Sequence, residues 1–142
     1  MASLHTYLTF NGDCEKAFEF YKSVFGGEFE SMSRFSEMPD DPKFQVADED
    51  KDKIMHVSLA IGSGSVLMGS DTAGEMAKHF KQGNNFSISF DADSREEADK
   101  YFSELSTDGQ VIMPMNSTFW GSYFGMLTDS FGVQWMVSFA ES

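Results

Sequence analysis

The sequence has three histidines and one cysteine, and these candidate bases and nucleophiles are widely separated. His56 lies on the polar side of an alternating segment, beside Ser58. Because histidine titrates near neutral pH, His56 fits either a general base or a hydrogen-bonded structural histidine. Cys14 has no histidine near it in the sequence, which favours an ordinary surface or half-buried thiol over a nucleophile.

Several motifs that define enzyme classes are missing from the chain. The sequence contains no GxxxxGK phosphate loop, no GxGxxG after a predicted strand and no GxSxG nucleophile turn. A nucleotide-like cofactor would need such a glycine-rich loop between a strand and a helix. The sequence therefore argues against a methyltransferase, and no cofactor is expected.

An aromatic cluster lies near the C-terminal end, where Trp120 and Tyr123 are accompanied by Phe119 and Phe124. Alternation along a strand places Tyr123 and Phe124 on opposite faces. One face should belong to the core, and the other should line a ligand site or a contact with a second copy. Core or interface packing and ligand stacking remain open alternatives for this cluster.

Composition indicates a globular protein and excludes several partners. The chain has 142 residues, 41% of them hydrophobic and 15% aromatic, enough to bury a core. Its 10 basic and 23 acidic residues give a net charge of −13, which disfavours nucleic acid and anionic membrane surfaces. No apolar run is long enough to span a membrane, and the first residues do not resemble a secretory leader. The expected location is the cytoplasm.

Hydrophobic periodicity in the first half predicts one strand, one helix and three further strands. The predicted strands cover residues 4–10, 29–35, 54–61 and 65–70, and a helix is predicted after Asp13, its expected N-cap. Residues 36–53 differ, because seven of these eighteen residues are acidic and two are proline. This segment is expected to be a long exposed loop. This loop is either a lid or a solvent-exposed loop without a functional role.

The second half repeats the order of the first, with predicted strands over 85–90, 111–115, 122–128 and 133–139 and a helix capped at Asp93-Ser94. Phe10 and Asp13 match Phe90 and Asp93 at one common offset, and the apolar stripes of the two helices match at nearly the same offset. A duplicated βαβββ unit explains this repeat. The predicted fold is α+β, with two tandem βαβββ modules forming a curved eight-stranded sheet around a cup. We expect one domain, with a first module over 1–71, a connector over 72–83 and a second module over 84–142.

Three segments carry most of a resemblance to a known family: the predicted helix with its end at 18–27, the segment 54–56 and the stretch from Met113 to Trp135. Over nearly its whole length, the chain resembles the vicinal oxygen chelate superfamily, which includes glyoxalase I, extradiol dioxygenases and bleomycin-resistance proteins. Within it, the sequence is most similar to the PhnB-like group, often labelled 3-demethylubiquinone methyltransferase-like.

This resemblance implies where a divalent metal would be held. Enzymes of the superfamily use one ligand from the first and last strand of each half. The corresponding residues are His5, Met68, Asn85 and Met136. Two neutral thioethers and an amide suit Zn, Ni, Mn or Fe poorly. No metal site is therefore expected, and the two methionines are interpreted as a flexible apolar lining of the cup.

The favoured function is that of a PhnB-like protein that binds a small organic molecule, cationic or aromatic, in the cup. The expected ligand-contacting residues are His5, Tyr7, His56, Met68, Asn85, Trp120, Tyr123 and Met136. Two alternatives stay open: a metal-dependent lyase, isomerase or dioxygenase with altered ligands, and a structural protein without a ligand. A homodimer is expected, because members of the superfamily commonly associate in this way.

Overall fold

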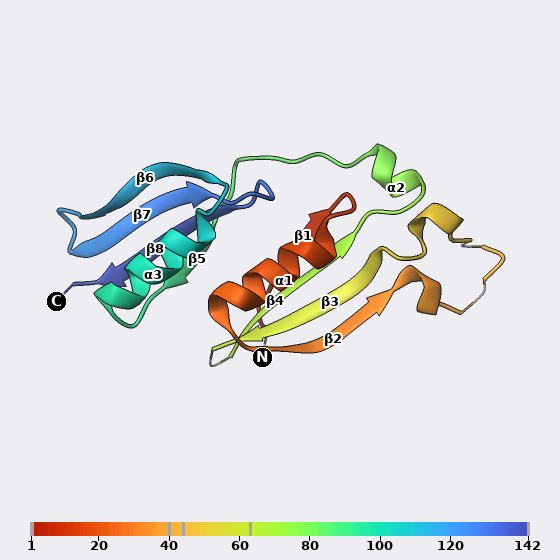
Figure 1. Ribbon diagram of the computed structural model, residues 1–142, viewed down its shortest axis with the longest axis horizontal. Coiled ribbons are helices and arrows are strands. Elements are labelled where there is room, and N and C mark those ends of the chain that lie inside the picture. The colour runs from red at the N-terminus through yellow and green to blue at the C-terminus, as the bar shows by residue number, and fades with distance from the viewer. Residues whose placement is uncertain (1, 40, 44, 63, 142) are drawn as a thin grey trace. The chain divides into compact units, whose positions relative to one another are not determined.

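The computed structural model describes residues 2–39, 41–43, 45–62 and 64–141, and it contains two modules of the same design (Figure 1). The chain forms two compact units, Met1–Lys81 and Gln82–Ser142. Each unit has one strand, one main helix and three further strands in that order. The four strands of each unit form one mixed sheet. The predicted α+β fold with tandem βαβββ modules is confirmed.

The first unit holds a sheet of order β1-β4-β3-β2, in which β1 is parallel to β4 and the other pairs are antiparallel. Its elements are β1 (Thr6–Phe10), α1 (Cys14–Phe25), β2 (Glu28–Arg34), the short 3-10 helices η1 (Phe35–Glu37) and η2 (Asp48–Asp50), β3 (Ile54–Ile61), β4 (Ser65–Asp71) and α2 (Glu75–Lys78).

Helix α1 covers one face of this sheet and forms the first core with it (Figure 1). Leu8, Leu59 and Leu67 are buried on that face, and Phe18 of the helix is buried against them. Gly69 allows the close approach, because a Cβ atom there would lie 2.6 Å from a ring carbon of Phe18. The opposite face of the sheet is not covered by this helix.

The second unit repeats the arrangement with a sheet of order β5-β8-β7-β6. Its elements are β5 (Ile88–Asp91), α3 (Arg95–Leu105), β6 (Gln110–Ser117), β7 (Ser122–Thr128) and β8 (Gln134–Ala140). The core under α3 includes Phe102, Leu127 and Val137. Pro114 lies in β6, an edge strand whose register shifts at that point, as expected for proline in a sheet.

Two strands begin later than the alternation predicts. β1 starts at Thr6, and Leu4 is 99% exposed before it. β5 starts at Ile88, and Phe86 is 63% exposed before it. In both cases pairing with the parallel neighbour begins only at the later residue. Side-chain alternation alone does not reveal where such a partner strand ends.

The N-terminus of α1 is satisfied from a distant strand rather than by the expected cap. Asp13 makes no side-chain hydrogen bond to the helix. The backbone amides of Gly12 and Cys14 instead donate to one carboxylate oxygen of Asp71, at 2.9 and 3.0 Å. Asp13 occupies the N-cap position as predicted, but its expected side-chain hydrogen bond to the helix is not made. In the second unit, Ser94 caps α3 as predicted.

Among the described residues, no helix is both long and apolar enough to cross a membrane.

Candidate functional site

The open face of the first sheet brings together three of the predicted ligand-contacting residues. Tyr7 lies opposite Met68, and Met68 lies opposite Ser58 across the neighbouring pair of strands. Directly paired residues project from the same face, and this row lies on the face away from α1. Tyr7 is 47% exposed, so its ring is available to solvent beside the half-buried thioether of Met68.

His56 joins this row from the same side of β3. The Tyr7 hydroxyl and His56 Nδ1 lie 3.5 Å apart, and the two ring centroids are 5.9 Å apart. Either group can donate in this contact, depending on the tautomer of the imidazole. Ser58 is buried and donates to Glu30 Oε1 at 3.2 Å. The face therefore offers an aromatic ring, an imidazole and a thioether as neighbours, a set suited to stacking and hydrogen bonding with an organic molecule.

The open face of the second sheet carries a row of methionines. Met136 lies opposite Met126, and Met126 lies opposite Met113. Ser89 of β5 completes the row on the other side of Met136. The sequence interpretation included Met136 but missed its two neighbours. Strand register is the signal that finds them, since alternation alone does not say which strands are adjacent.

His5 and Asn85 do not lie within the strands expected to carry them. His5 is exposed ahead of β1, and its Nε2 is 3.1 Å from Ser3 Oγ. Asn85 is exposed in the segment that precedes β5. Both residues lie just before the point where strand pairing begins.

Tyr123 lies in the core on the α3 side of its sheet, which is one of the two placements that the sequence leaves open for the aromatic cluster. It is 7% exposed, and its hydroxyl donates to Asp99 Oδ1 of α3 at 2.6 Å. This hydrogen bond is the main reason that the pKa of Tyr123 is raised. The Arg95 guanidinium lies 4.0 Å from the ring centroid. Both partners come from the helix side, so the ring is not presented to a ligand on the other face.

Trp120 lies in the turn between β6 and β7 and is 59% exposed. Its ring packs against Phe119, at a centroid distance of 5.0 Å, and against Phe124, at 6.1 Å. Phe124 projects from the open face, since it pairs with Ser138 in the register of Met136. Trp120 thus remains available for contact with a ligand or another protein surface.

The residues at the four superfamily ligand positions do not fit a divalent metal. Met68 and Met136 supply neutral thioethers, and Asn85 supplies an amide. Within residues 2–39, 41–43, 45–62 and 64–141, no three His, Cys, Asp or Glu side chains are grouped so that they could hold a metal ion. The donor set therefore gives no basis for a metal-dependent step.

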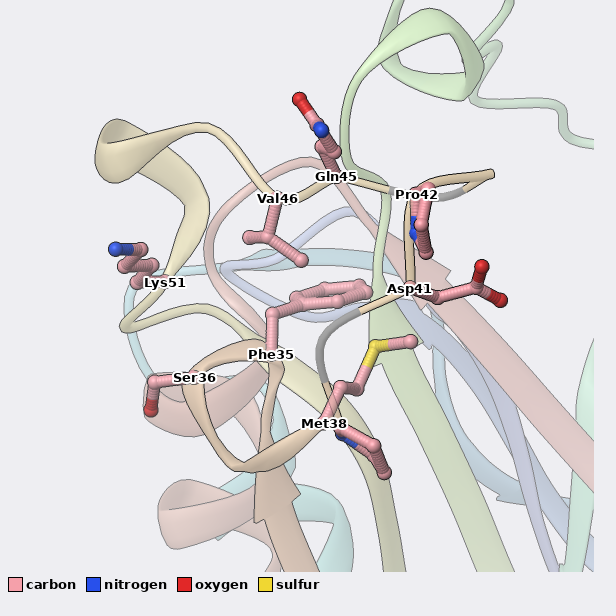
Figure 2. A pocket seen from close by; sticks show the side chains of 9 residues that line it. Phe35, Ser36, Met38, Asp41, Pro42, Gln45, Val46 and Lys51 are labelled. Atoms are coloured by element: carbon pink, nitrogen blue, oxygen red, sulfur yellow. The ribbon is translucent and has the colours of Figure 1, made fainter.

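The sequence interpretation also missed a pocket formed by the acidic loop between β2 and β3. The pocket has a volume of about 540 Å³ and lies among residues 35–51 (Figure 2). The apolar residues in its lining are separated by acidic and proline residues in the sequence. No regular spacing therefore marks them as neighbours.

Comparison with known proteins identifies a family and similar structures. A family model described as "Glyoxalase/Bleomycin resistance protein/Dioxygenase superfamily" matches residues 3–137. Protein YjdN of Escherichia coli K12 is 28% identical over 95% of this chain and 93% of its own length.

Two solved structures of similar proteins share the fold over their full lengths. Protein PA1353 from Pseudomonas aeruginosa is 40% identical, covers 100% of both chains and superposes with a TM-score of 0.84. A Bacillus cereus protein described as a putative 3-demethylubiquinone-9 3-methyltransferase, PhnB protein, is 28% identical, with 98% of this chain and 100% of that chain covered and a TM-score of 0.75.

Proposed function

The chain belongs to the Glyoxalase/Bleomycin resistance protein/Dioxygenase superfamily, and on that premise we propose that it is a PhnB-like member that binds a small organic molecule without a catalytic divalent metal. The observation that carries the proposal is the open face of the first sheet. There Tyr7, His56 and Met68 lie side by side, outside the core under α1.

The chemistry of this face indicates the kind of ligand. A half-exposed tyrosine ring next to an imidazole favours a planar or aromatic group, held by stacking and by one or two hydrogen bonds. The thioether of Met68 adapts to the shape of an apolar surface. The net charge of −13 attracts cations at a distance and repels anions. An aromatic or cationic organic molecule is therefore the proposed ligand.

Methionine methyl groups provide a direct test. The chain has 10 methionines, so methyl-labelled protein reports on Met68 in the first sheet and on Met126 and Met136 in the second. A library of aromatic and cationic compounds should yield ligands that shift one or more of these signals with saturation and also raise the melting temperature.

Variants locate the site. Tyr7→Ala and His56→Ala should each weaken binding about tenfold, because each removes a ring that contacts the ligand. Phe86→Ala is the matched control, since Phe86 is also an exposed aromatic residue but lies outside both sheets. If no compound shifts these methyl signals, or if Tyr7→Ala binds as tightly as the unaltered protein, the proposal is wrong.

We also propose that the protein forms a homodimer through the β6 edge of the second unit. Residues 109–128 contain no charged side chain, although 23% of the whole chain is charged. Several large apolar residues of this stretch are exposed: Val111, Ile112, Met113, Phe119 and Trp120. Edge strands usually carry charges that prevent pairing, and β6 has none. A second copy is the favoured occupant, because two chains of charge −13 repel each other least where neither carries charge.

A further inference from the structure

The acidic loop between β2 and β3 is anchored to the rest of its unit. Antiparallel pairing continues beyond the strands, since the amides of Phe35 and Ser36 donate to the carbonyls of Lys53 and Lys51 at 3.1 and 3.0 Å. Phe35 is buried under the loop. Asp50 is also buried, and its carboxylate accepts from Lys53 Nζ at 2.7 Å and from the Gly74 amide at 3.2 Å. These contacts give the base of the loop a defined shape.

The pocket in this loop has an apolar floor. In Figure 2 the ring of Phe35 lies at the centre of the pocket, between Val46 and Met38, with Pro42 nearby. Its volume of about 540 Å³ is in the range of small-molecule sites. An aromatic ring flanked by a thioether and a branched aliphatic group favours a flat apolar group as the occupant.

The segment that forms this pocket is acidic in sequence. Residues 36–53 contain seven acidic and three basic residues, a net charge of −4. Among the described residues of the lining, Asp41 and Lys51 are charged, and they lie on opposite sides of Phe35 (Figure 2). Lys51 is paired with Asp48 at 2.9 Å, outside the lining, so its positive charge is partly balanced. A ligand with a positive charge is therefore favoured near Asp41.

We infer that this loop pocket is a second binding site, which takes a small organic cation with an aromatic or branched apolar group. The apolar group packs on Phe35, Met38 and Val46, and the ammonium group lies toward Asp41. The site shares no residue with the open-face site of the first sheet, so each can exist without the other.

Three probes of similar size and different charge separate the effect of charge from that of shape: phenethylammonium, 2-phenylethanol and phenylacetate. The readout is the methyl signal of Met38, with Met76 as an exposed methionine outside the pocket. Phenethylammonium should shift the Met38 signal with saturation. The neutral alcohol should bind roughly two- to fivefold more weakly, the range expected for one exposed charge interaction, and the anion more weakly still.

Two variants and one control test the assignment. Asp41→Asn keeps the oxygen that accepts from the Lys43 amide, so it removes charge without breaking that contact. This variant should bind phenethylammonium roughly two- to fivefold more weakly and should bind the alcohol as tightly as the unaltered protein does. Val46→Ser should weaken the binding of all three probes. Glu49→Gln removes a charge from the same loop but outside the lining, and it should have a smaller effect than Asp41→Asn.

Two results would overturn the inference. One is a Met38 signal that does not respond to phenethylammonium. The other is equal binding of the three probes, with Asp41→Asn indistinguishable from Glu49→Gln. If the Met68 signal responds while the Met38 signal does not, the open-face site stands and the loop site is rejected.

Discussion

At the scale of single residues, Cys14 shows that burial can affect the pKa of a thiol more strongly than a helix N-terminus does. The thiol lies at the first residue of α1, where the helix N-terminus favours a thiolate. The side chain is nevertheless completely buried, and Asp71 and Glu15 add negative charge near it. Burial above all, followed by these two carboxylates, raises the pKa of Cys14. The sequence interpretation of a surface or half-buried thiol is therefore wrong, because the Cys14 side chain is fully buried.

This environment predicts that Cys14 is inert in the folded protein. A raised thiol pKa leaves less thiolate at every pH below it, and burial also blocks access to reagents. At pH 8, reaction with a disulfide reagent such as DTNB should be at least about a hundredfold slower than in urea-unfolded protein, whose thiol has an ordinary pKa. Comparable rates in the folded and unfolded states would contradict this prediction.

Tyr123 gives a second prediction at this scale. Replacing it with phenylalanine removes the hydrogen bond to Asp99 but keeps the ring under Arg95. The free energy of unfolding should fall by about 1 kcal/mol, the usual contribution of one such bond. Ligand-induced shifts at Met136 should not change, because Tyr123 lies on the other face. If the Tyr123→Phe variant bound ligand more weakly with unchanged stability, Tyr123 would belong to the ligand site.

At the scale of elements, one buried carboxylate holds three segments together. Asp71 accepts from Gly12 and Cys14 at the start of α1, and its other oxygen accepts from the Ile54 amide at the start of β3, at 2.9 Å. In the second unit, buried Asp129 accepts from two nearby amides and from the indole of Trp135. Asp71 is the last residue of the inner strand β4, and Asp129 directly follows the inner strand β7. Each aspartate satisfies donors that would otherwise lack a partner.

Asp71→Asn should therefore be strongly destabilising. The amide keeps one acceptor but places N–H groups against a backbone N–H, so a buried donor loses its partner at a cost of about 2–4 kcal/mol. Asp13→Asn is the matched control, since Asp13 is exposed and makes no cap hydrogen bond. It should change the free energy of unfolding by less than about 0.5 kcal/mol. Urea unfolding of the two variants tests this, and equal effects would show that Asp71 does not hold the helix.

Asp50 anchors the acidic loop, and its charge predicts that the stability of the fold depends on pH. Hydrogen bonding to Lys53, above all, and to the Gly74 amide lowers the pKa of Asp50. A carboxylate with a lowered folded-state pKa stabilises the fold above its unfolded pKa of about 4, and this stabilisation disappears as the pH falls through the folded-state value. Asp50→Asn should therefore be less stable than the unaltered protein at pH 7, and the difference should shrink at pH 3. A difference that stays constant with pH would contradict the role of the charge.

Elements and their faces follow from the sequence more readily than sites do. Alternation placed β3 and β7 correctly because each lies between two other strands, where one face is buried and the pattern is strong. His5 and Asn85 lie beyond the ends of their strands, where pairing and not side-chain pattern sets the limit. The methionine row and the loop pocket depend on strand register and on loop conformation. Local hydrophobic periodicity predicts neither strand register nor loop conformation.

At the scale of the whole molecule, charge is distributed unevenly along the chain. The net charge is −13, seven of the 23 acidic residues lie in the segment 36–53, and residues 109–128 carry no charge at all. The first region attracts cations, whereas the second contains the edge strand β6, the turn after it and the inner strand β7. An acidic chain stays dispersed through repulsion between its copies. A charge-free surface is where that repulsion is weakest and where apolar burial can outweigh it.

The proposed homodimer follows from this distribution and can be tested by a single charge. The unaltered chain should sediment at twice its mass of 15.9 kDa at micromolar concentration. Ile112→Glu places a carboxylate on the exposed β6 edge, so a symmetric contact would bring two like charges together and weaken association at least about tenfold. Met76→Glu adds the same charge at an exposed methionine in α2 and should leave the mass unchanged. A monomer at all concentrations, or an Ile112→Glu variant as dimeric as Met76→Glu, would show that the β6 edge is not the contact.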